Sequence, residues 1–407
     1  MTTSNAFHPS VLAGRKPVVI AAVVHAINDA YVAFLPAMLP LYALRLGMDG
    51  VALAGLVATY AISASLPGPA LGLLADRIGA RRVTAASVLL SAVLMSLLTV
   101  EPDPIWLYAL TALAGLGSAA IHPSGSTLAR QGRVTPELAV ALFSAAGMLG
   151  YAAGPMLLGA ARTWADGWML PVLAAPGLLA AAVTLVMLPH DAPSRKAGNS
   201  PRFAWSLITG PVGLLTLAAA FAFLPSSAML NGLPLLLAER YGLDPADPIL
   251  ARTISVYSLA SAAGGIGVGL LVSRLRRRVL LALVLAGSVP ASMSVLLFAP
   301  PQPAFLAALV LAGMLAYAST PLFVVAAQNL APGASAAASG IIFGLAAALT
   351  GALYFGIGLV QTRYGAETAL MLAFSTPLVA VLIALPVLGK TDKSVAALKE
   401  FHPCPSI

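Results

Sequence analysis

The feature that most limits how this chain can fold is a series of twelve long apolar runs. Each run is close to or longer than the ~20 residues that an α-helix needs to cross the hydrocarbon core of a bilayer. The runs lie at about 18–44, 51–74, 83–100, 104–129, 137–161, 168–189, 207–237, 252–273, 279–299, 304–330, 336–360 and 367–388. Of the 407 residues, 59% are hydrophobic and only 9% are charged, whereas about a quarter of a water-soluble domain is charged. The sequence therefore predicts an all-α membrane protein with twelve transmembrane helices.

The basic residues are divided unevenly between the loops that join these runs. With both chain ends on one side, 17 of the 22 Lys and Arg residues fall in one set of loops and 5 in the other. This asymmetry predicts cytoplasmic termini in a bacterial inner membrane. The net charge of +8 then reports orientation, so the expected partner is the lipid bilayer and not a nucleic acid. The single cysteine, Cys404, excludes an internal disulfide framework.

The two halves of the chain resemble each other. LAGLGSAAIHP at 113–123 matches LAGMLAYASTP at 311–321, LPLYALRLGMD at 39–49 matches LPLLLAERYGLD at 233–244, and GLLADRIGARR at 72–82 matches GLLVSRLRRR at 269–278. Such a duplication is typical of transporters with like-oriented halves. We expect six-helix bundles at 1–190 and 207–389, a cytoplasmic linker at 191–206 and a cytoplasmic tail at 390–407. A membrane scaffold or receptor that kept the duplication is the alternative.

No motif of a known catalytic or nucleotide-binding site is present. The chain lacks a P-loop, a GxSxG nucleophile elbow and an HExxH zinc motif. We therefore expect no enzyme activity, no metal, no cofactor and no energy from ATP bound by this chain. The expected partners are a small-molecule substrate and protons, and the expected state is a monomer.

The loop after the second run carries a recognisable motif. Gly72-Leu-Leu-Ala-Asp76-Arg77-Ile-Gly79-Ala-Arg81-Arg resembles the loop signature of the major facilitator superfamily. The resemblance implies two six-helix bundles with a central path and a cytoplasmic gate built from these residues. Asp76 and Arg77 at a helix end can pair with charges or helix termini of a neighbouring bundle. The alternative is a plain turn with the arginines that orientation requires.

The fifth run contains small residues at four-residue spacing. Gly150-Tyr-Ala-Ala-Gly154-Pro155-Met-Leu-Leu-Gly159 resembles the signature of antiporters in the same superfamily. Small residues let two helices approach closely, and Gly-Pro favours a kink. The resemblance implies export against protons, and generic helix packing is the alternative.

Polar residues in the first and fourth runs narrow the resemblance further. His25-Ala-Ile-Asn28-Asp29 and His122-Pro-Ser-Gly-Ser resemble the fosmidomycin-resistance branch of the superfamily. Of the 14 acidic residues, only Asp29 lies deep within a predicted span. At ~1.5 Å per residue, Asp29 is roughly 16 Å and His122 roughly 12 Å from the cytoplasmic side. A carboxylate and imidazoles at similar depth predict a proton-coupling site of Asp29, His25 and His122, with buried structural residues as the alternative.

Candidate substrate ligands are fewer. Asn28 shares a helical face with His25 and Asp29, and we expect it to bind substrate or a neighbouring helix. In the second half, Asn231, Tyr317 and Tyr354 are polar or aromatic side chains within predicted spans. We expect these residues to contact a ligand by hydrogen bonding or stacking.

These observations predict a proton-coupled efflux transporter that works by alternating access. The branch resemblance implies antibiotic resistance through export of a phosphonate hydroxamate drug. Export of an endogenous metabolite such as a siderophore remains an alternative, and proton-driven import is a second one.

Overall fold

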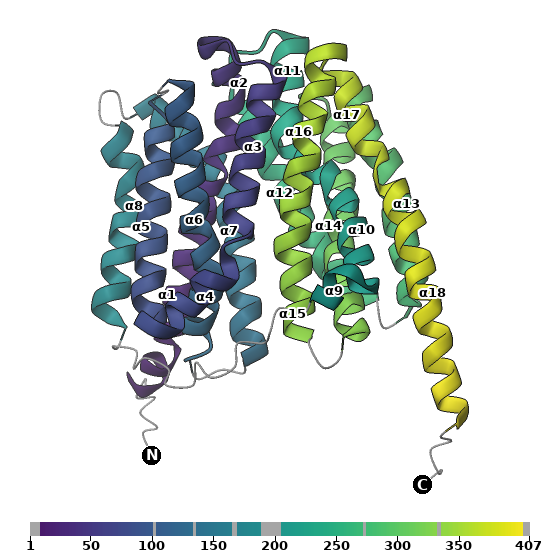
Figure 1. Ribbon diagram of the computed structural model, residues 1–407. Coiled ribbons are helices and arrows are strands. Elements are labelled where there is room, and N and C mark those ends of the chain that lie inside the picture. The colour runs from purple at the N-terminus through teal and green to yellow at the C-terminus, as the bar shows by residue number, and fades with distance from the viewer. Residues whose placement is uncertain are drawn as a thin grey trace, which may run out of the picture. The chain divides into compact units, whose positions relative to one another are not determined.

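The structure, a computed structural model, is helical throughout the residues that it describes, which are 9–100, 103–132, 136–164, 169–188, 205–271, 274–331 and 335–401, and these residues include no strand (Figure 1). Within these ranges, 10 helices are long and apolar enough to cross a membrane. The number rises to 11 if the pair Gly50–Ser65 and Ala70–Ile78, bent by 46°, is counted as one span. Val172–Met187 is a shorter apolar helix. The chain is thus an all-α membrane protein, and its helices follow the twelve predicted runs.

The helices pack into two compact units. The first unit comprises Met1–Leu35 and Pro67–Gly198, and the second comprises Pro36–Leu66 and Asn199–Ile407. One boundary falls within the predicted linker at 191–206. The other two differ from the predicted division at 190, because the segment Pro36–Leu66 packs with the second unit.

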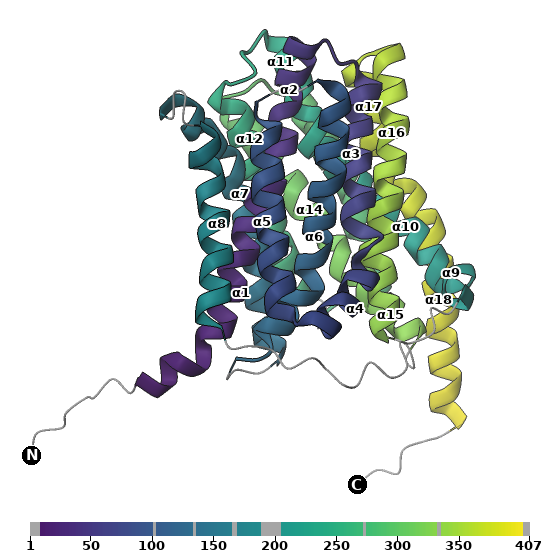
Figure 2. The ribbon, with the colours of Figure 1, turned by 60° about the vertical axis from the view of Figure 1, so that its left-hand side comes forward.

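The first unit is built from six helices around one apolar core. They are α1 (Pro9–Val32), α4 (Gly68–Ile78), α5 (Ala80–Leu98), α6 (Pro104–Ala129), α7 (Pro136–Trp164) and α8 (Met169–Met187). Helix α1 contacts α5, α6, α7 and α8 (Figure 2). Val24, Ile121 and Phe143 from three of these helices are buried in the core. Helix α1 is therefore central to this unit, and its polar residues face neighbours on several sides.

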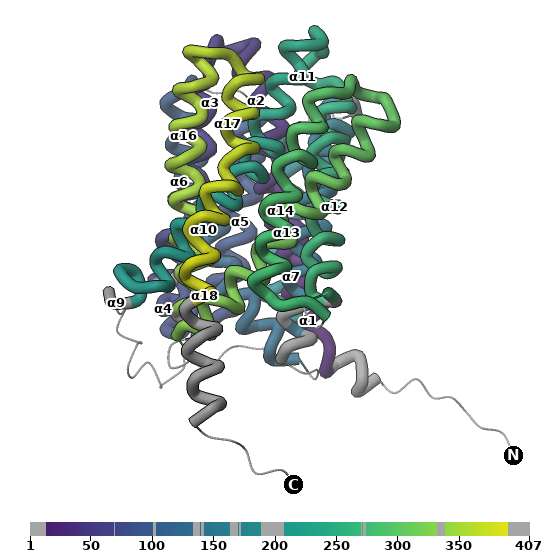
Figure 3. The backbone as a smooth tube through the Cα atoms, turned by 90° about the vertical axis from the view of Figure 1, so that its right-hand side faces the viewer, coloured from purple at the N-terminus to yellow at the C-terminus, as the bar shows by residue number. Residues whose placement is uncertain are grey.

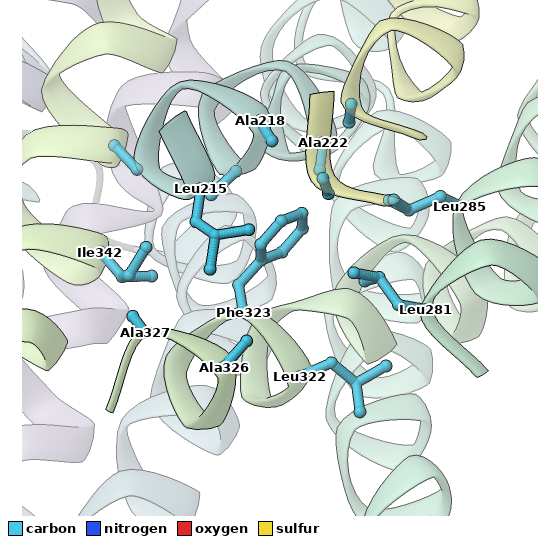
Figure 4. Packing of buried hydrophobic residues seen from close by; sticks show 14 of the residues in the cluster. Leu215, Ala218, Ala222, Leu281, Leu285, Leu322, Phe323, Ala326, Ala327 and Ile342 are labelled. Carbon is cyan, nitrogen blue, oxygen red and sulfur yellow. The ribbon is translucent and has the colours of Figure 1, made fainter. Parts of the chain in front are cut away.

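The second unit holds the remaining helices. They are α2 (Phe34–Leu46), α3 (Gly50–Ser65), α9 (Trp205–Thr209), α10 (Pro211–Ser227), η1 (Ala228–Gly232), α11 (Leu233–Tyr241), α12 (Pro248–Leu271), α13 (Arg277–Ser294), η2 (Val295–Leu297), α14 (Pro303–Leu330), α15 (Ser335–Gly340), η4 (Ile341–Leu345), α16 (Ala346–Tyr364), α17 (Ala366–Ser375) and α18 (Pro377–Phe401). Its core centres on Phe323, whose ring points among Leu215, Ala218 and Ala222 of α10 (Figure 4).

Prolines explain some of the breaks within spans. Proline lacks the N–H that bonds to the carbonyl four residues earlier, and its ring crowds that carbonyl. The first span breaks at Ala33, between Val32 and Phe34 and just before Pro36, and the second breaks at Leu66–Pro67. Pro155, Pro176, Pro225 and Pro290 instead lie inside uninterrupted helices. The breaks at Pro36 and Pro67 coincide with the limits of the segment that joins the second unit.

The internal repeat appears in the structure as a repeated turn. Gly47 and Gly242 occupy equivalent positions of the repeat and both have positive φ, 63° and 59°. Each precedes an aspartate whose side chain accepts a backbone N–H, Asp49 from Ala52 and Asp244 from Ala246. Left-handed backbone favours glycine, so the shared Gly-x-Asp pattern has a physical cause in both halves.

Candidate functional site

The close packing of α1 against α7 positions the candidate site. A Cβ atom built on Gly150 would lie 1.8 Å from the carbonyl oxygen of Ala26, and one on Gly154 would lie 2.2 Å from that of Ala30. Only glycine fits at such backbone contacts. These two glycines of α7 therefore bring the polar face of α1 against α7, while α6 contacts both helices.

Three neighbouring side chains of α1 form the centre of the site. His25 Nε2 lies 3.3 Å from Asp29 Oδ2, and Asn28 Nδ2 donates to Asp29 Oδ1 over 2.9 Å. His25 and Asn28 are 4% and 0% exposed. Asn28 is therefore a partner of Asp29 in this conformation, and it is out of reach of a ligand. Its Oδ1 finds no hydrogen-bond partner among the described residues.

Helices α6 and α7 complete the surroundings of His25. Its Nδ1 lies 2.8 Å from the carbonyl oxygen of Phe143, and its ring stacks on the Phe143 ring at 4.0 Å between centroids. The ring of His122 on α6 lies edge-on to it, 5.1 Å between centroids and 88° between planes. His122 itself is exposed. The cluster thus runs from the exposed imidazole of His122 to the buried His25, whose partner Asp29 is half-buried.

Two glycines make room for this cluster. A Cβ on Gly147 of α7 would lie 2.5 Å from His25 Cε1 and 2.6 Å from Asp29 Oδ2. A Cβ on Gly125 of α6 would lie 2.7 Å from Cε2 of the Phe143 ring that stacks on His25. Both distances are shorter than real Cβ contacts, so any larger residue must displace the His–Asp pair or the ring beside it.

The contacts of His25 constrain where its hydrogens lie. A carbonyl oxygen can only accept, so His25 Nδ1 carries the hydrogen that it donates to Phe143. Nε2 lies 3.3 Å from Asp29 Oδ2 but makes no hydrogen bond there. A neutral imidazole would turn a lone pair toward the carboxylate, so a proton on His25 or Asp29 would favour this contact and its loss would weaken it.

The predicted gate residues have different surroundings. Asp76 and Arg77 are exposed near the end of α4, and Gly72 packs against Pro123 of α6. Gly79 joins α4 to α5 with φ 101°, a left-handed value that favours glycine. Their gate role remains a prediction.

Arg81 was expected at the gate, yet it is 6% exposed. Its Nη1 donates to the carbonyl oxygens of Leu185 and Leu188 at 2.9 Å each. These carbonyls lie at the end of α8, where backbone acceptors lack helical partners. Arg81 therefore caps α8 in this conformation.

Pro155 and Gly159, the other two residues of the predicted packing motif, do not account for the close approach of α7 to α1. Pro155 is buried within the continuous helix α7. A Cβ on Gly159 would meet no atom within 4 Å. The close approach thus depends on Gly150 and Gly154.

The candidate ligand residues of the second unit are largely enclosed. Asn231 lies in the π-helical turn η1, and its Nδ2 donates to the carbonyl of Ser227 over 2.9 Å. Tyr354 of α16 is 2% exposed, with its hydroxyl 3.2 Å from where a Cβ of Gly232 would lie. The structure thus brings Tyr354 beside the turn that carries Asn231. Tyr317 of α14 packs against Gly265 of α12.

Sequence reasoning assigned no role in the site to Phe143, Gly125 or Gly147, although Gly125 lies within the motif that begins at His122. Phe143 resembles any buried aromatic in an apolar run, and its contribution includes a backbone carbonyl, which the sequence does not reveal. The sequence does contain one signal for Gly147. It lies three residues before Gly150 and seven before Gly154, so it shares the helix face of the predicted packing motif on α7. Among the described residues, no group of three or more His, Cys, Asp or Glu side chains could hold a metal ion.

Comparison with known families agrees with this architecture. The model of the Major Facilitator Superfamily matches residues 18–354. The chain belongs to the Major Facilitator Superfamily. The helical fold, the internal duplication and the span count all fit this membership.

Solved structures of similar fold include other members. A variant of the nucleoside transporter NupG has a TM-score of 0.77 and 12% identity, covering 91% of this chain and 99% of its own. A bacterial homologue of the human lysosomal transporter Spinster, in an inward-facing and unoccupied conformation, has a TM-score of 0.73 and 14% identity, covering 93% and 96%. At such identities the likeness shows the fold alone. A search of curated protein sequences gives no significant match.

Proposed function

We propose that this transporter is a proton-coupled antiporter that exports a small polar or amphipathic molecule, as in the fosmidomycin-resistance branch. The single observation that carries the proposal is the close His25–Asp29 contact within a membrane span, beside the exposed His122. An ionisable group within a membrane span is a functional site by default. The Gly150–Gly154 contact, in the stretch that resembles the antiporter signature, supports export over import.

The proposed cycle couples that proton to the shape of the first unit. A proton arrives from outside at His122 and passes to the His25–Asp29 pair, which favours the arrangement described above. When the proton leaves toward the cytoplasm, a lone pair and a carboxylate face each other, and α1 must shift against α6 and α7. Substrate binds during that second state. Asp76 and Arg77 would then hold the cytoplasmic gate in one of the two conformations.

The test replaces Asp29 with asparagine in purified protein reconstituted into proteoliposomes. Asp29→Asn keeps the size of the side chain but cannot release a proton, so fosmidomycin transport driven by an imposed pH gradient should be abolished. Substrate-induced proton movement, followed with a pH-sensitive dye inside the vesicles, should vanish as well. Counterflow of labelled fosmidomycin without a pH gradient should persist, because it needs no net proton transfer.

The matched control is Asp103→Asn, which makes the same chemical change at an exposed carboxylate that caps no backbone group of α6. It should transport like the unchanged protein. Full gradient-driven transport by Asp29→Asn would contradict the coupling role. Loss of both driven transport and counterflow would instead indicate that Asp29 is required for binding or folding.

The substrate follows from the resemblance and not from the geometry. Fosmidomycin is a phosphonate hydroxamate, and a natural hydroxamate siderophore shares one of its two groups. We place drug efflux first and export of an endogenous siderophore or similar metabolite second, with Asn231, Tyr317 and Tyr354 as candidate contacts. Transport assays with fosmidomycin and with a hydroxamate siderophore separate these two. Accumulation on the same side as the higher proton concentration identifies antiport, and the reverse identifies proton-driven import.

We also propose a bacterial inner membrane location with both termini cytoplasmic, based on the basic residues of the loops. Cys404 is the single cysteine of the chain, so a membrane-impermeant maleimide should label it in inside-out vesicles but not in intact spheroplasts. A Cys404→Ala protein that carries Ala246→Cys, exposed between α11 and α12, should show the opposite pattern. Labelling of Cys404 in intact spheroplasts would overturn the orientation.

A further inference from the structure

A small recess with a basic rim lies in the second unit, between α13, α14 and α18. Its polar residues are Arg277 and Arg278 at the start of α13 and Asn329 near the end of α14. All three are exposed. Helix α13 packs against both α14 and α18, and Figure 3 shows it beside them. None of these residues belongs to the proton-coupling cluster, which lies in the first unit.

The floor of the recess is apolar and fixed by the core. Leu281, Leu322 and Ala326 line it, and each is at most 8% exposed. Figure 4 shows the side chains of Leu322 and Phe323 leaving α14 in different directions, with Phe323 toward α10 and Leu322 away from it. A rigid apolar floor beneath two guanidinium groups fits a ligand that is anionic at one end and apolar at the other.

The position of Arg278 shows that its guanidinium crosses the recess. A Cβ built on Gly389 of α18 would lie 2.9 Å from its Nη1 and 3.1 Å from its Cζ. The absence of a side chain at Gly389 thus lets Arg278 reach from α13 to α18. Within the described part of the chain, the ion pairs that are formed include His25–Asp29 and Arg240–Glu367, and neither Arg277 nor Arg278 takes part in one.

The size of the recess decides the class of ligand. Its volume is about 90 Å³, whereas sites for drug-sized ligands measure ~300–1,000 Å³. A whole substrate does not fit, but a phosphate group does. Arginine forks match phosphate oxygens in geometry and charge. Beyond the rim, Val279 and Leu283 of α13 are 46% and 59% exposed, which suits acyl chains lying along the helix.

We propose that this recess binds the phosphate of an anionic phospholipid, with Arg277, Arg278 and Asn329 holding the headgroup. With the orientation proposed above, the recess lies in the cytoplasmic leaflet, where anionic lipids attract basic clusters next to membrane helices. The lipid bridges the start of α13, the end of α14 and the middle of α18.

The test uses native mass spectrometry of the full-length protein in a neutral detergent, titrated separately with phosphatidylglycerol, phosphatidylcholine and inorganic phosphate. Arg277→Gln/Arg278→Gln should weaken phosphatidylglycerol binding by roughly tenfold or more, because two charge-assisted contacts are lost. The matched control is Arg274→Gln/Arg276→Gln, which removes the same charge from the same loop at two residues that do not line the recess. It should bind phosphatidylglycerol like the unchanged protein.

Equal weakening by the two double variants would overturn the proposal in favour of diffuse attraction. Equal binding of phosphatidylcholine would show that the negative charge is irrelevant, and equal binding of inorganic phosphate would show that no lipid is selected. Either result rejects the site. Should the arginine variant fail to fold, Asn329→Leu supplies the test, since it keeps both charges and should weaken binding about threefold by removing one hydrogen bond.

Discussion

The two units carry equivalent segments of the internal repeat but different chemistry. Aligned through Pro123 and Pro321, His122 of α6 corresponds to Thr320 of α14. In the first unit, the ring of His122 on α6 lies edge-on to the ring of His25 on α1, with 5.1 Å between centroids. In the second unit, Thr320 is 7% exposed and the adjacent Ser319 donates to the carbonyl of Ala316 in its own helix.

The unit that carries the ionisable cluster has the more regular backbone there, and the unit without such a cluster has the irregular turns. The ionisable cluster of the first unit lies on regular α-helix in α1, α6 and α7. The second unit has π-helical turns at η1 and η4, and Asn231 lies in the first of them. π-helical turns occur often at functional sites. The comparison teaches that the two copies of a duplicated fold can diverge separately, one in its ionisable residues and the other in its backbone geometry.

Among variants that keep every ionisable group of the cluster, the largest expected effect comes from disturbing its geometry. In Gly147→Ala, the added methyl would lie within 2.6 Å of both His25 and Asp29. Overpacking of this kind costs about 1–3 kcal/mol, so the pair must separate. We expect transport driven by a pH gradient to fall roughly tenfold or more, measured as initial rates in proteoliposomes.

Gly159→Ala is the control for that variant. Gly159 lies on the same helix, α7, and a methyl added there would meet no atom within 4 Å. It should retain transport and thermal stability. Unchanged driven transport in Gly147→Ala would show that the His25–Asp29 distance is not part of the mechanism. A lower melting temperature with the ratio of driven transport to counterflow unchanged would point to a purely structural glycine.

Much of the fold could be predicted from the sequence because its causes are local. Long apolar runs define helices by length alone, and the Gly-x-Asp turns at Gly47 and Gly242 follow from backbone geometry. The prolines were visible too, but which of them break a span is not a local property. Pro36 and Pro67 bound a segment that packs with the other unit, whereas Pro155 and Pro176 are held within α7 and α8 by their neighbours.

The site could be predicted where it depended on one helix and missed where three helices meet. The spacing of His25 and Asp29 on α1 implies contact by itself. Phe143 and Gly125 act through the fit of α7 against α1 and α6, and an all-round apolar helix has no periodicity that marks the contacting face. Arg81 is the opposite case, a residue that was assigned to the site from the sequence but that the structure places elsewhere. A basic loop residue was expected at a gate, and its burial against the end of α8 depends on packing between α5 and α8.

The smaller expected effects compare the repeat partners directly. His122→Gln removes the exposed member of the cluster but leaves the His25–Asp29 pair, so driven transport should slow by roughly tenfold. This is less than the ~10²–10⁴-fold loss typical of a removed proton-transfer group, because the pair can still exchange protons directly. The loss should grow as the pH rises, since protons become scarcer and direct access to the His25–Asp29 pair is slower. Rates measured from about pH 5.5 to about pH 8.5, which spans the ordinary histidine pKa of ~6.5, check this.

Thr320→Val makes the matching change in the second unit, and it exchanges a hydroxyl for a methyl at nearly constant volume. Because the second unit has no ionisable cluster there among its described residues, we expect driven transport to stay within about twofold of the unchanged protein, a difference that corresponds to less than ~0.5 kcal/mol. A change in apparent KM for the exported molecule at constant pH dependence would place Thr320 at the substrate. A pH-dependent loss like that of His122→Gln would mean that both units take part in proton transfer. The two units would then differ in their residues but not in their role in coupling.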